Sequence, residues 1–427
     1  MQKKLGAGNT TGVTAVVLLL LTSTKPIAGA VAAGDNAAAF EVLCDLISLA
    51  KSQPAGPKLE SDSTSAYEEL LKLNSTLSPK EWTDKFVDNA NAKTYHQAVP
   101  PKITDPGNWK ELWPDWVKAV EAVAKEENMD EIKKMNLANL NPRQLETTTV
   151  TVRQLAEEAR ELRKERAGLA GDLKLADDDT IRKQLNKAAF GDENTGQVTP
   201  AAAKVFSSAS QTYTAACSTT GAAQKATAVL AAAACLCVKD HTDNEAQYCG
   251  KSAKLTATWT TASATIPDTA VTEPAAFWKA KAAPTLTSGS LQSKLEAVTR
   301  LIRVSTNAAI LGTSETGTCT GKDTAGVCVS VTDGAQGKSP DASTFTWGAT
   351  LKTLADNLRK KEETVKKAKQ LDEKIQQLKA RAFKTTIHTN IVKAGTADAK
   401  DQPAQDASQT SHVKADCKKH NNSKTKF

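Results

Sequence analysis

Two long stretches of this chain carry apolar residues in alternating steps of three and four positions, and they lie far apart in the sequence. The first begins near residue 143 and the second at Leu351. This spacing puts the apolar side chains on one stripe of a helix, with charged residues on the other faces. The stripe positions are Val152, Leu155, Ala159, Leu162, Leu169, Leu173 and Ala176 in the first stretch, and Leu351, Leu354, Leu358, Val365, Ala368, Leu371, Ile375, Leu378 and Ala382 in the second.

A long helix with one apolar stripe must bury that stripe against another element, because an exposed stripe loses its hydrophobic stabilisation. We therefore predict that the two stretches pack lengthwise against each other, together with a helix around Cys44. A helix over about 143–189 would be roughly 70 Å long at 1.5 Å per residue. Arg166 interrupts the first stripe, and two successive three-residue steps around Ala368 predict a local overwinding of the second.

The region between the two stretches, about 190–350, has a different composition. It is rich in Ala, Thr and Gly, carries six of the eight cysteines and contains strand-like pieces such as VCVSV. Aromatic residues make up only 4% of the chain, which suits helices with narrow apolar stripes better than a thick globular core. We predict a mainly α fold: an elongated helical bundle built on a long antiparallel coiled-coil hairpin, with a disulfide-containing top lobe that carries short β elements.

A stretch from about 60 to 140 is rich in tryptophan and punctuated by proline. Trp109, Trp113 and Trp116 fall on one face of the expected helix. We interpret them as core residues of a lobe, because a buried aromatic side chain removes a large apolar area from water. An aromatic platform that binds carbohydrate is the alternative.

The N-terminus has the order of a secretory signal peptide. MQKK is positively charged, Val13–Leu21 is an apolar run, and AGAVAA is a small-residue cleavage region that ends near Ala33. The run is shorter than the roughly 20 apolar residues that cross a bilayer. We predict that residues 1–33 are removed and that the chain enters the secretory pathway.

Because disulfides persist in that pathway, the cysteines are expected to pair. Cys319 and Cys328 bracket a Gly/Thr loop and are the best candidates for a local bridge, whereas the other pairings stay open. The predicted disulfide cysteines are Cys44, Cys217, Cys235, Cys237, Cys249, Cys319 and Cys328. A zinc site is the alternative, although its spacing matches no standard zinc module. Its ligands would be Cys235, Cys237, His241 and Cys249.

The sequence carries little sign of catalysis. DGAQGKSP lacks the spacing of a phosphate-binding loop, no nucleophile elbow occurs, and the five histidines are dispersed without metal-ligand spacing. We predict that the protein is not an enzyme and uses no cofactor and no metal. The net charge of +7 comes without an Arg-rich stripe, so no nucleic-acid partner is expected.

Modification signals are clearer. Asn74 in NST and Asn421 in NNS are N-glycosylation acceptors in a secreted chain, while Asn9 matches but lies in the signal peptide. Ser339, in a Gly-containing loop before Pro340, is a place where an O-linked sugar would fit easily.

The order of these features resembles the variant surface glycoproteins of African trypanosomes, and most of all their B-type N-terminal domain. The resemblance rests on the signal peptide, the FEVLCDLISLA helix, the two stripes around a cysteine-bearing lobe, the CLC element, and a polar linker before a CKK tail. It covers about residues 34–417. We therefore expect an N-terminal domain at 34–394, a linker at 395–411 and the start of a truncated C-terminal domain at 412–427.

The resemblance implies a function as well as a fold. Such proteins form a dense coat on the parasite, held in the membrane by a glycosylphosphatidylinositol (GPI) anchor. The bundle stands upright as a homo-oligomer, the top lobe meets host antibodies, and switching among variants evades immunity. The resemblance also makes Ser339 a candidate for an O-linked hexose. The alternative is a helical-bundle surface receptor that binds a host macromolecule.

The end of the chain departs from the family pattern. A full C-terminal domain would supply partners for Cys417 and then an apolar anchor signal, and neither follows Cys417 here. We expect a truncated or frameshifted gene, or an incomplete sequence. As written, the chain is expected to be secreted or retained rather than anchored to the outer face of the plasma membrane.

Overall fold

The computed structural model describes residues 30–395, except for 92, 105–106, 128, 241–246, 251–254, 261–263 and 281–284, with side chains described as far as residue 385. Residues 1–29 of the predicted signal peptide, the linker after residue 395 and the C-terminal tail with Cys417 and Asn421 lie outside the described residues, as does His241. None of the helices in the described ranges has the length and apolarity that a bilayer crossing requires.

The chain forms two compact units. The first comprises the residues up to Asp62 together with Lys164–Asp372, and the second comprises Ser63–Arg163 together with the residues from Glu373 onward. Helices α6 (Pro142–Gly168) and α14 (Thr346–Gly395) each contribute residues to both units. The predicted domain at 34–394 includes the greater part of both units, and its limits stay a prediction.

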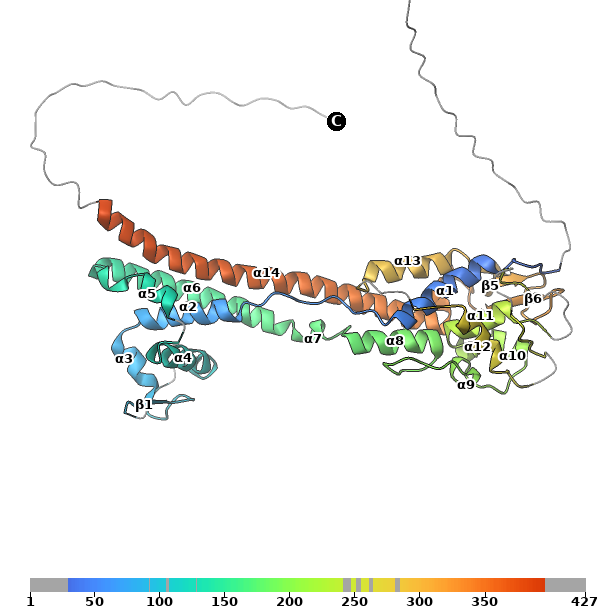
Figure 1. The fold of residues 1–427 in the computed structure, drawn as a ribbon, viewed down its shortest axis with the longest axis horizontal. Coiled ribbons are helices and arrows are strands. Elements are labelled where there is room, and N and C mark those ends of the chain that lie inside the picture. Colours follow the sequence, from blue (N-terminus) through green and yellow to red (C-terminus); the bar gives the residue numbers. More distant parts are fainter. Residues whose placement is uncertain are drawn as a thin grey trace, which may run out of the picture. The chain divides into compact units, whose positions relative to one another are not determined.

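Helix α11 (Val229–Cys237) lies at the centre of the first unit's core. All nine of its residues are buried. A helix that is apolar on every face is stable only when other elements surround it. The helix around Cys44, α1 (Ala37–Ser52), packs against α11 together with α8 (Asp178–Phe190) and α12 (Thr269–Ala276), as Figure 1 shows. The unit also contains α7 (Ala170–Leu173), α9 (Ala202–Val205), α10 (Tyr213–Cys217) and α13 (Ser288–Thr299).

A small sheet completes this core. Strands β5 (Ala308–Ser314) and β6 (Gly326–Val331) are antiparallel, with Leu311 opposite Val329. The order is β3-β6-β5-β4, where β3 (Ser218–Thr219) runs parallel to β6 and β4 (Arg303–Ser305) is antiparallel to β5. All six residues of β6 are buried: the strand lies between β3 and β5, and α11 packs against it. The β element predicted at VCVSV is therefore confirmed.

The predicted continuous helix over about 143–189 is wrong. Helix α6 ends at Gly168, α7 is one short turn, and α8 begins after Asp177. Gly168 and Gly171 weaken the helix because glycine loses more backbone entropy than other residues. The Asp177 carboxylate then accepts a hydrogen bond from a backbone N–H of the first turn of α8, which caps a new helix. Between the two helices the apolar stripe is interrupted, and Leu169 is only half-buried.

The stripe of α14 contains polar residues that the periodicity did not predict. Lys361, Thr364 and Asp372 are buried, whereas the predicted Val365 is half-buried. Lys361 Nζ donates a hydrogen bond of 2.7 Å to the carbonyl oxygen of Ala176. Burying a charged group is unfavourable unless it finds such partners.

Asp372 has its partner in Arg166, the residue that interrupts the first predicted stripe. Arg166 Nε lies 3.4 Å from Asp372 Oδ1, and Ser61 Oγ donates a hydrogen bond of 2.9 Å to Oδ2. The Asp372 side chain is only 1% exposed, and that of Arg166 is 26% exposed. The interruption of one stripe thus matches a buried carboxylate on the other.

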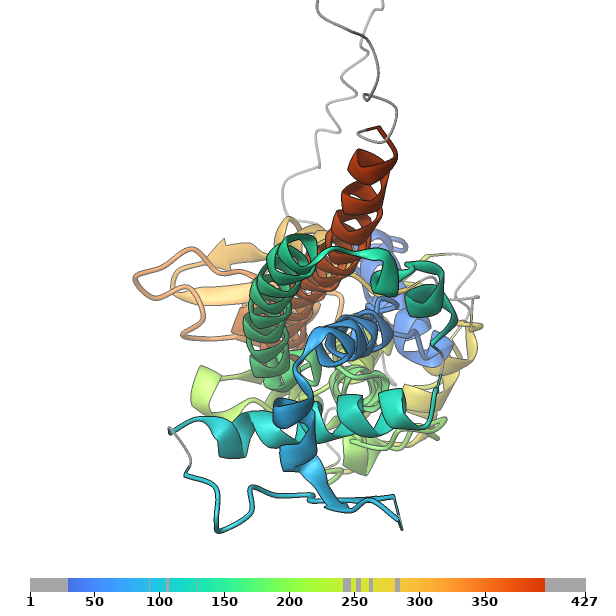
Figure 2. The ribbon, with the colours of Figure 1, turned by 90° about the vertical axis from the view of Figure 1, so that its left-hand side faces the viewer.

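The second unit joins the two predicted stripes in one core. Its helices include α2 (Thr64–Leu77), α4 (Trp109–Ala124), α5 (Asp130–Lys134), α6 up to Arg163 and α14 from Glu373. In this unit α6 and α14 run in opposite directions, and Figure 2 shows them beside α2. The shared core contains Val152, Leu155 and Ala159 of α6 and Ile375, Leu378 and Ala382 of α14. The mainly α fold class is confirmed.

A tryptophan cluster forms a separate core in the same unit. Trp113 is fully buried, and its indole N–H donates a hydrogen bond of 2.6 Å to the carbonyl oxygen of His96. Trp109 and Trp116 are partly buried beside it. So are Trp82 from α3 (Lys80–Thr83) and Tyr95. Tyr95 belongs to a hairpin of two strands, β1 (Val87–Asn89) and β2 (Thr94–Tyr95). Core packing of the helical face is therefore confirmed for Trp113.

Candidate functional site

Three disulfides fix the core of the first unit. They join Cys217 to Cys235, Cys237 to Cys249, and Cys319 to Cys328. The last is the local bridge that the Gly/Thr loop predicted. Cys235 and Cys237 lie two positions apart on α11, and their bridges tie this helix to α10 and to the loop that follows α11. In a chain-entropy view, each bridge over a loop of this length stabilises the fold by about 2–3 kcal/mol.

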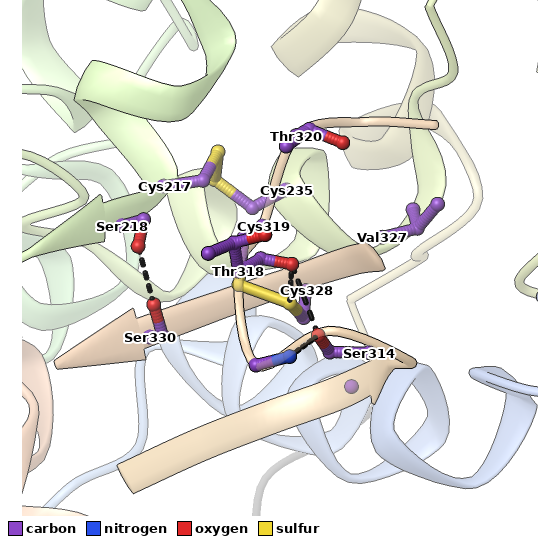
Figure 3. The surroundings of a disulfide bond; sticks show 12 residues. Cys217, Ser218, Cys235, Ser314, Thr318, Cys319, Thr320, Val327, Cys328 and Ser330 are labelled. Atoms are coloured by element: carbon purple, nitrogen blue, oxygen red, sulfur yellow. Dashed lines mark hydrogen bonds between the residues drawn. A yellow bond between two sulfur atoms is a disulfide. The ribbon is translucent and has the colours of Figure 1, made fainter. Parts of the chain in front are cut away.

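Figure 3 shows two of these bridges in the part of the core where α11 meets β6. Next to them, Ser218 and Ser330 share a hydrogen bond of 2.8 Å between their hydroxyl groups. The zinc alternative is wrong for Cys235, Cys237 and Cys249, because their sulfur atoms are in disulfides and provide no thiolate.

Cys44 differs from the other predicted disulfide cysteines. In the part of the chain that the structure describes it is a free thiol, so the expected bridge at this position is not present there. Burial raises the pKa of the thiol to about 11, although a hydrogen bond with Trp278 opposes the shift. Cys44 is therefore a neutral, weakly nucleophilic group at physiological pH.

Two polar loops extend from the strands of the small sheet. The loop between β5 and β6 is held by the Ser314 hydroxyl (Figure 3). This group accepts a hydrogen bond of 2.9 Å from the backbone N–H of Gly317 and donates one of 3.0 Å to the carbonyl oxygen of Thr318. The loop after β6 is held by Asp333, whose carboxylate accepts a hydrogen bond of 2.6 Å from the backbone of Gly221. Both loops expose side chains at several positions, including Glu315.

Ser339, the predicted O-glycosylation candidate, lies in the second of these loops. Its side chain is exposed, as are those of Gln336 and Lys338. The loop is anchored on each side of Ser339: Ala335 donates a backbone hydrogen bond of 2.8 Å to Asn307, and Asp341 forms an ion pair of 3.0 Å with Lys352. A sugar could attach there without disturbing the core.

Asn74 lies near the C-terminal end of α2, a different setting from the exposed loop of most sequons. The side chain is half-buried, and no donor in the described part of the chain reaches its buried Oδ1. Thr76, the third residue of the sequon, donates a hydrogen bond of 2.8 Å to the carbonyl oxygen of Lys72 one turn earlier. Asn74 is thus fixed by its helix rather than by a loop.

Asn74 also borders a cavity of about 400 Å³ in the second unit. At one side of it, Asp115 accepts a hydrogen bond of 2.9 Å from the Tyr67 hydroxyl. Burial and the neighbouring Asp115 carboxylate raise the pKa of Tyr67, so the phenol stays protonated. Arg160 and Glu157 form an ion pair across one turn of α6, with 3.2 Å between Arg160 Nε and Glu157 Oε2.

Sequence reasoning did not find this cavity. Its walls come from α2, α3, α4 and α6, and none of its charged residues forms a motif with its neighbours in the sequence. The available signal was the sequon beside a tryptophan-rich stretch, which the prediction treated as two separate features.

The comparisons with known proteins agree with this structure. Residues 16–377 match the family model of the trypanosomal VSG domain, where VSG stands for variant surface glycoprotein. Because the match covers most of the chain, the protein belongs to the trypanosomal variant surface glycoprotein family, whose members are surface coat proteins. Over 390 residues the chain is 23% identical to variant surface glycoprotein ILTAT 1.23 of Trypanosoma brucei brucei. That alignment covers 87% of this chain and 71% of the relative.

Proposed function

We propose that the protein acts as one variant of a dense coat that shields the parasite surface and evades host antibodies by antigenic variation. Family membership supports the coat, and the observation that carries the variation is the contrast between core and loops in the first unit. The core is held by three disulfides and a fully buried strand. The adjoining loops expose polar side chains.

This contrast gives antigenic variation a physical basis. Substitutions at exposed positions change stability by less than about 0.5 kcal/mol, whereas core substitutions cost several times more. Loop residues such as Glu315, Gln336 and Lys338 can therefore change the surface that an antibody contacts while the fold is kept. On this proposal the protein has no catalytic role, and its partners are further copies of the coat and host antibodies.

The modifications and the membrane attachment belong to the same proposal. An O-linked hexose on Ser339 would enlarge the exposed surface of its loop, and N-glycans would be carried by Asn74 and Asn421. We propose that the chain follows the secretory pathway to the outer face of the plasma membrane and is held there by a GPI anchor. This attachment is supported by the family alone.

Expression in trypanosomes of the gene for this chain, as the only coat variant, tests the proposal, and secretion of the protein into the medium would contradict the GPI anchor. Surface biotinylation should label it, phospholipase treatment should release it, and antibodies raised against it should lose binding when Gln336 and Lys338 are both replaced by alanine. Strong labelling of underlying membrane proteins by antibodies in these cells would contradict the shielding role. Recovery of one serum macromolecule at a fixed ratio would instead favour the receptor alternative.

A further inference from the structure

The cavity beside Asn74 has walls of two chemical kinds. Trp82 and Trp116 line it with indole rings that meet at 76°, with 5.2 Å between their centroids. Asp115, Glu157 and Arg160 line it with charged groups. The cavity therefore offers an aromatic corner and hydrogen-bonding groups at the same place.

This combination is complementary to a sugar. A pyranose ring presents C–H groups on its faces, which pack on aromatic rings, and hydroxyl groups at its rim. Carboxylates accept hydrogen bonds from those hydroxyls, and a guanidinium donates to their oxygen atoms. A cavity of about 400 Å³ also lies within the range that binds small ligands.

Asn74 supplies the link between the cavity and a sugar. It is the acceptor residue of the NST sequon, and it forms part of the cavity wall. Its Oδ1 is buried without a donor from the described residues, which is unfavourable for an amide oxygen. A hydroxyl or amide group of a bound sugar can satisfy that oxygen.

We propose that the cavity holds the first sugars of an N-glycan on Asn74, so that the glycan is part of the packing of this unit. The inference rests on the proposed glycosylation of Asn74. An oligosaccharide carried by a polyprenyl diphosphate is transferred before folding: the bond between Asn74 Nδ2 and the anomeric carbon forms, the bond from that carbon to the phosphate oxygen breaks, and the amide loses one proton as the lipid diphosphate leaves. As α2 folds, the first sugars settle against Trp82 and Trp116.

The test uses the full chain secreted from eukaryotic cells with Asn421→Gln, so that Asn74 is the remaining acceptor of the mature chain. Thr76→Ala removes the sequon, and Thr76→Ser keeps both the sequon and the hydroxyl group. Mass spectrometry of the peptide that contains Asn74 measures occupancy. We expect full glycosylation with Thr or Ser at position 76 and none with Ala.

Docking is measured by the rate at which an endoglycosidase removes the glycan. We expect removal from the native protein to be at least about tenfold slower than from the denatured protein, because the cleavage site opens only transiently. Trp116→Ala should raise the native rate and lower the Tm more in the Thr76→Ser chain than in the Thr76→Ala chain. Trp109→Ala is the matched control: this residue packs in the same aromatic cluster but does not line the cavity, so its effect on Tm should be the same in both chains.

The outcomes separate the two proposals. An Asn74 peptide without a glycan overturns both the glycosylation and the docking. A glycan that is removed equally fast from native and denatured protein overturns the docking alone. The wild-type rate comparison also decides the case if Trp116→Ala does not fold.

Discussion

Replacing Asp372 by alanine removes the buried carboxylate that pairs α14 with Arg166 in the first unit. Arg166 Nε lies 3.4 Å from Asp372 Oδ1, and Ser61 Oγ donates to Oδ2 at 2.9 Å. In the variant, the Arg166 guanidinium and the Ser61 hydroxyl both lose the carboxylate that accepts from them. The guanidinium then stays partly buried without a counter-charge, and this uncompensated charge is what destabilises the fold.

The size of the effect follows from burial. Removal of one partner of a fully buried ion pair costs about 3–5 kcal/mol. The Arg166 side chain is 26% exposed and can recover some hydration, so we expect a loss of about 2–3 kcal/mol. For a unit of this size the loss corresponds to a Tm lower by about 5–10 °C.

Urea denaturation followed by circular dichroism measures this loss for the full chain. Glu165→Ala is the matched control, because Glu165 pairs with Lys367 at 2.8 Å between the same two helices while both side chains are about half exposed. Such an exposed pair contributes less than about 1 kcal/mol. The double variant Arg166→Met with Asp372→Leu should recover most of the loss, since apolar residues can replace a buried pair without cost.

The reasoning would be refuted by either of two results. If Asp372→Ala costs no more than Glu165→Ala, burial does not set the strength of this pair. If the double variant is less stable than Asp372→Ala, the unpaired guanidinium is not the source of the loss.

Three further predictions rest on other parts of the first unit. Replacement of Cys319 and Cys328 together by serine should lower the free energy of unfolding by about 2–3 kcal/mol, measured with urea, because the loop between two cysteines nine positions apart is no longer closed. The Cys44 thiol, whose pKa burial raises to about 11, should react slowly with iodoacetamide at pH 8, and the protein should lose stability as the pH rises from about 9 toward 11. Burial alone would raise the pKa of Glu273, but hydrogen bonds from Thr256 lower this pKa below its ordinary value of 4.5. The ionised Glu273 should therefore stabilise the fold above pH 4.5, and this contribution to the free energy of unfolding should be lost at lower pH. Urea titrations of Glu273→Gln should lack this loss. Fast alkylation of the folded protein, or an unchanged acid profile in Glu273→Gln, would contradict the respective prediction.

Several features of this protein could be read from its sequence because they depend on local spacing. The apolar stripes predicted helices that share a core, and Val152 and Ile375 do share one in the second unit. The short loop between Cys319 and Cys328 predicted their bridge. At one place the periodicity gave a wrong prediction, because it extended the first helix beyond Gly168. The helix ends there, since glycine loses more backbone entropy in a helix, and the Asp177 cap begins a new one.

Other features were decided only by the tertiary structure. Arg166 and its partner Asp372 lie 206 positions apart in the chain, and the cavity beside Asn74 joins residues of α2, α3, α4 and α6. The cysteines on α11 bond partners only 18 and 12 positions away, but the spacing left open which of these nearby cysteines would pair. Local spacing carries no information about such tertiary contacts, because a buried ion pair, a disulfide or a cavity forms only where particular helices pack together. The sequence by itself therefore determined the two apolar stripes, the local bridge and the family, whereas the fold decided where the first helix breaks and which charged, cysteine and sequon residues act together.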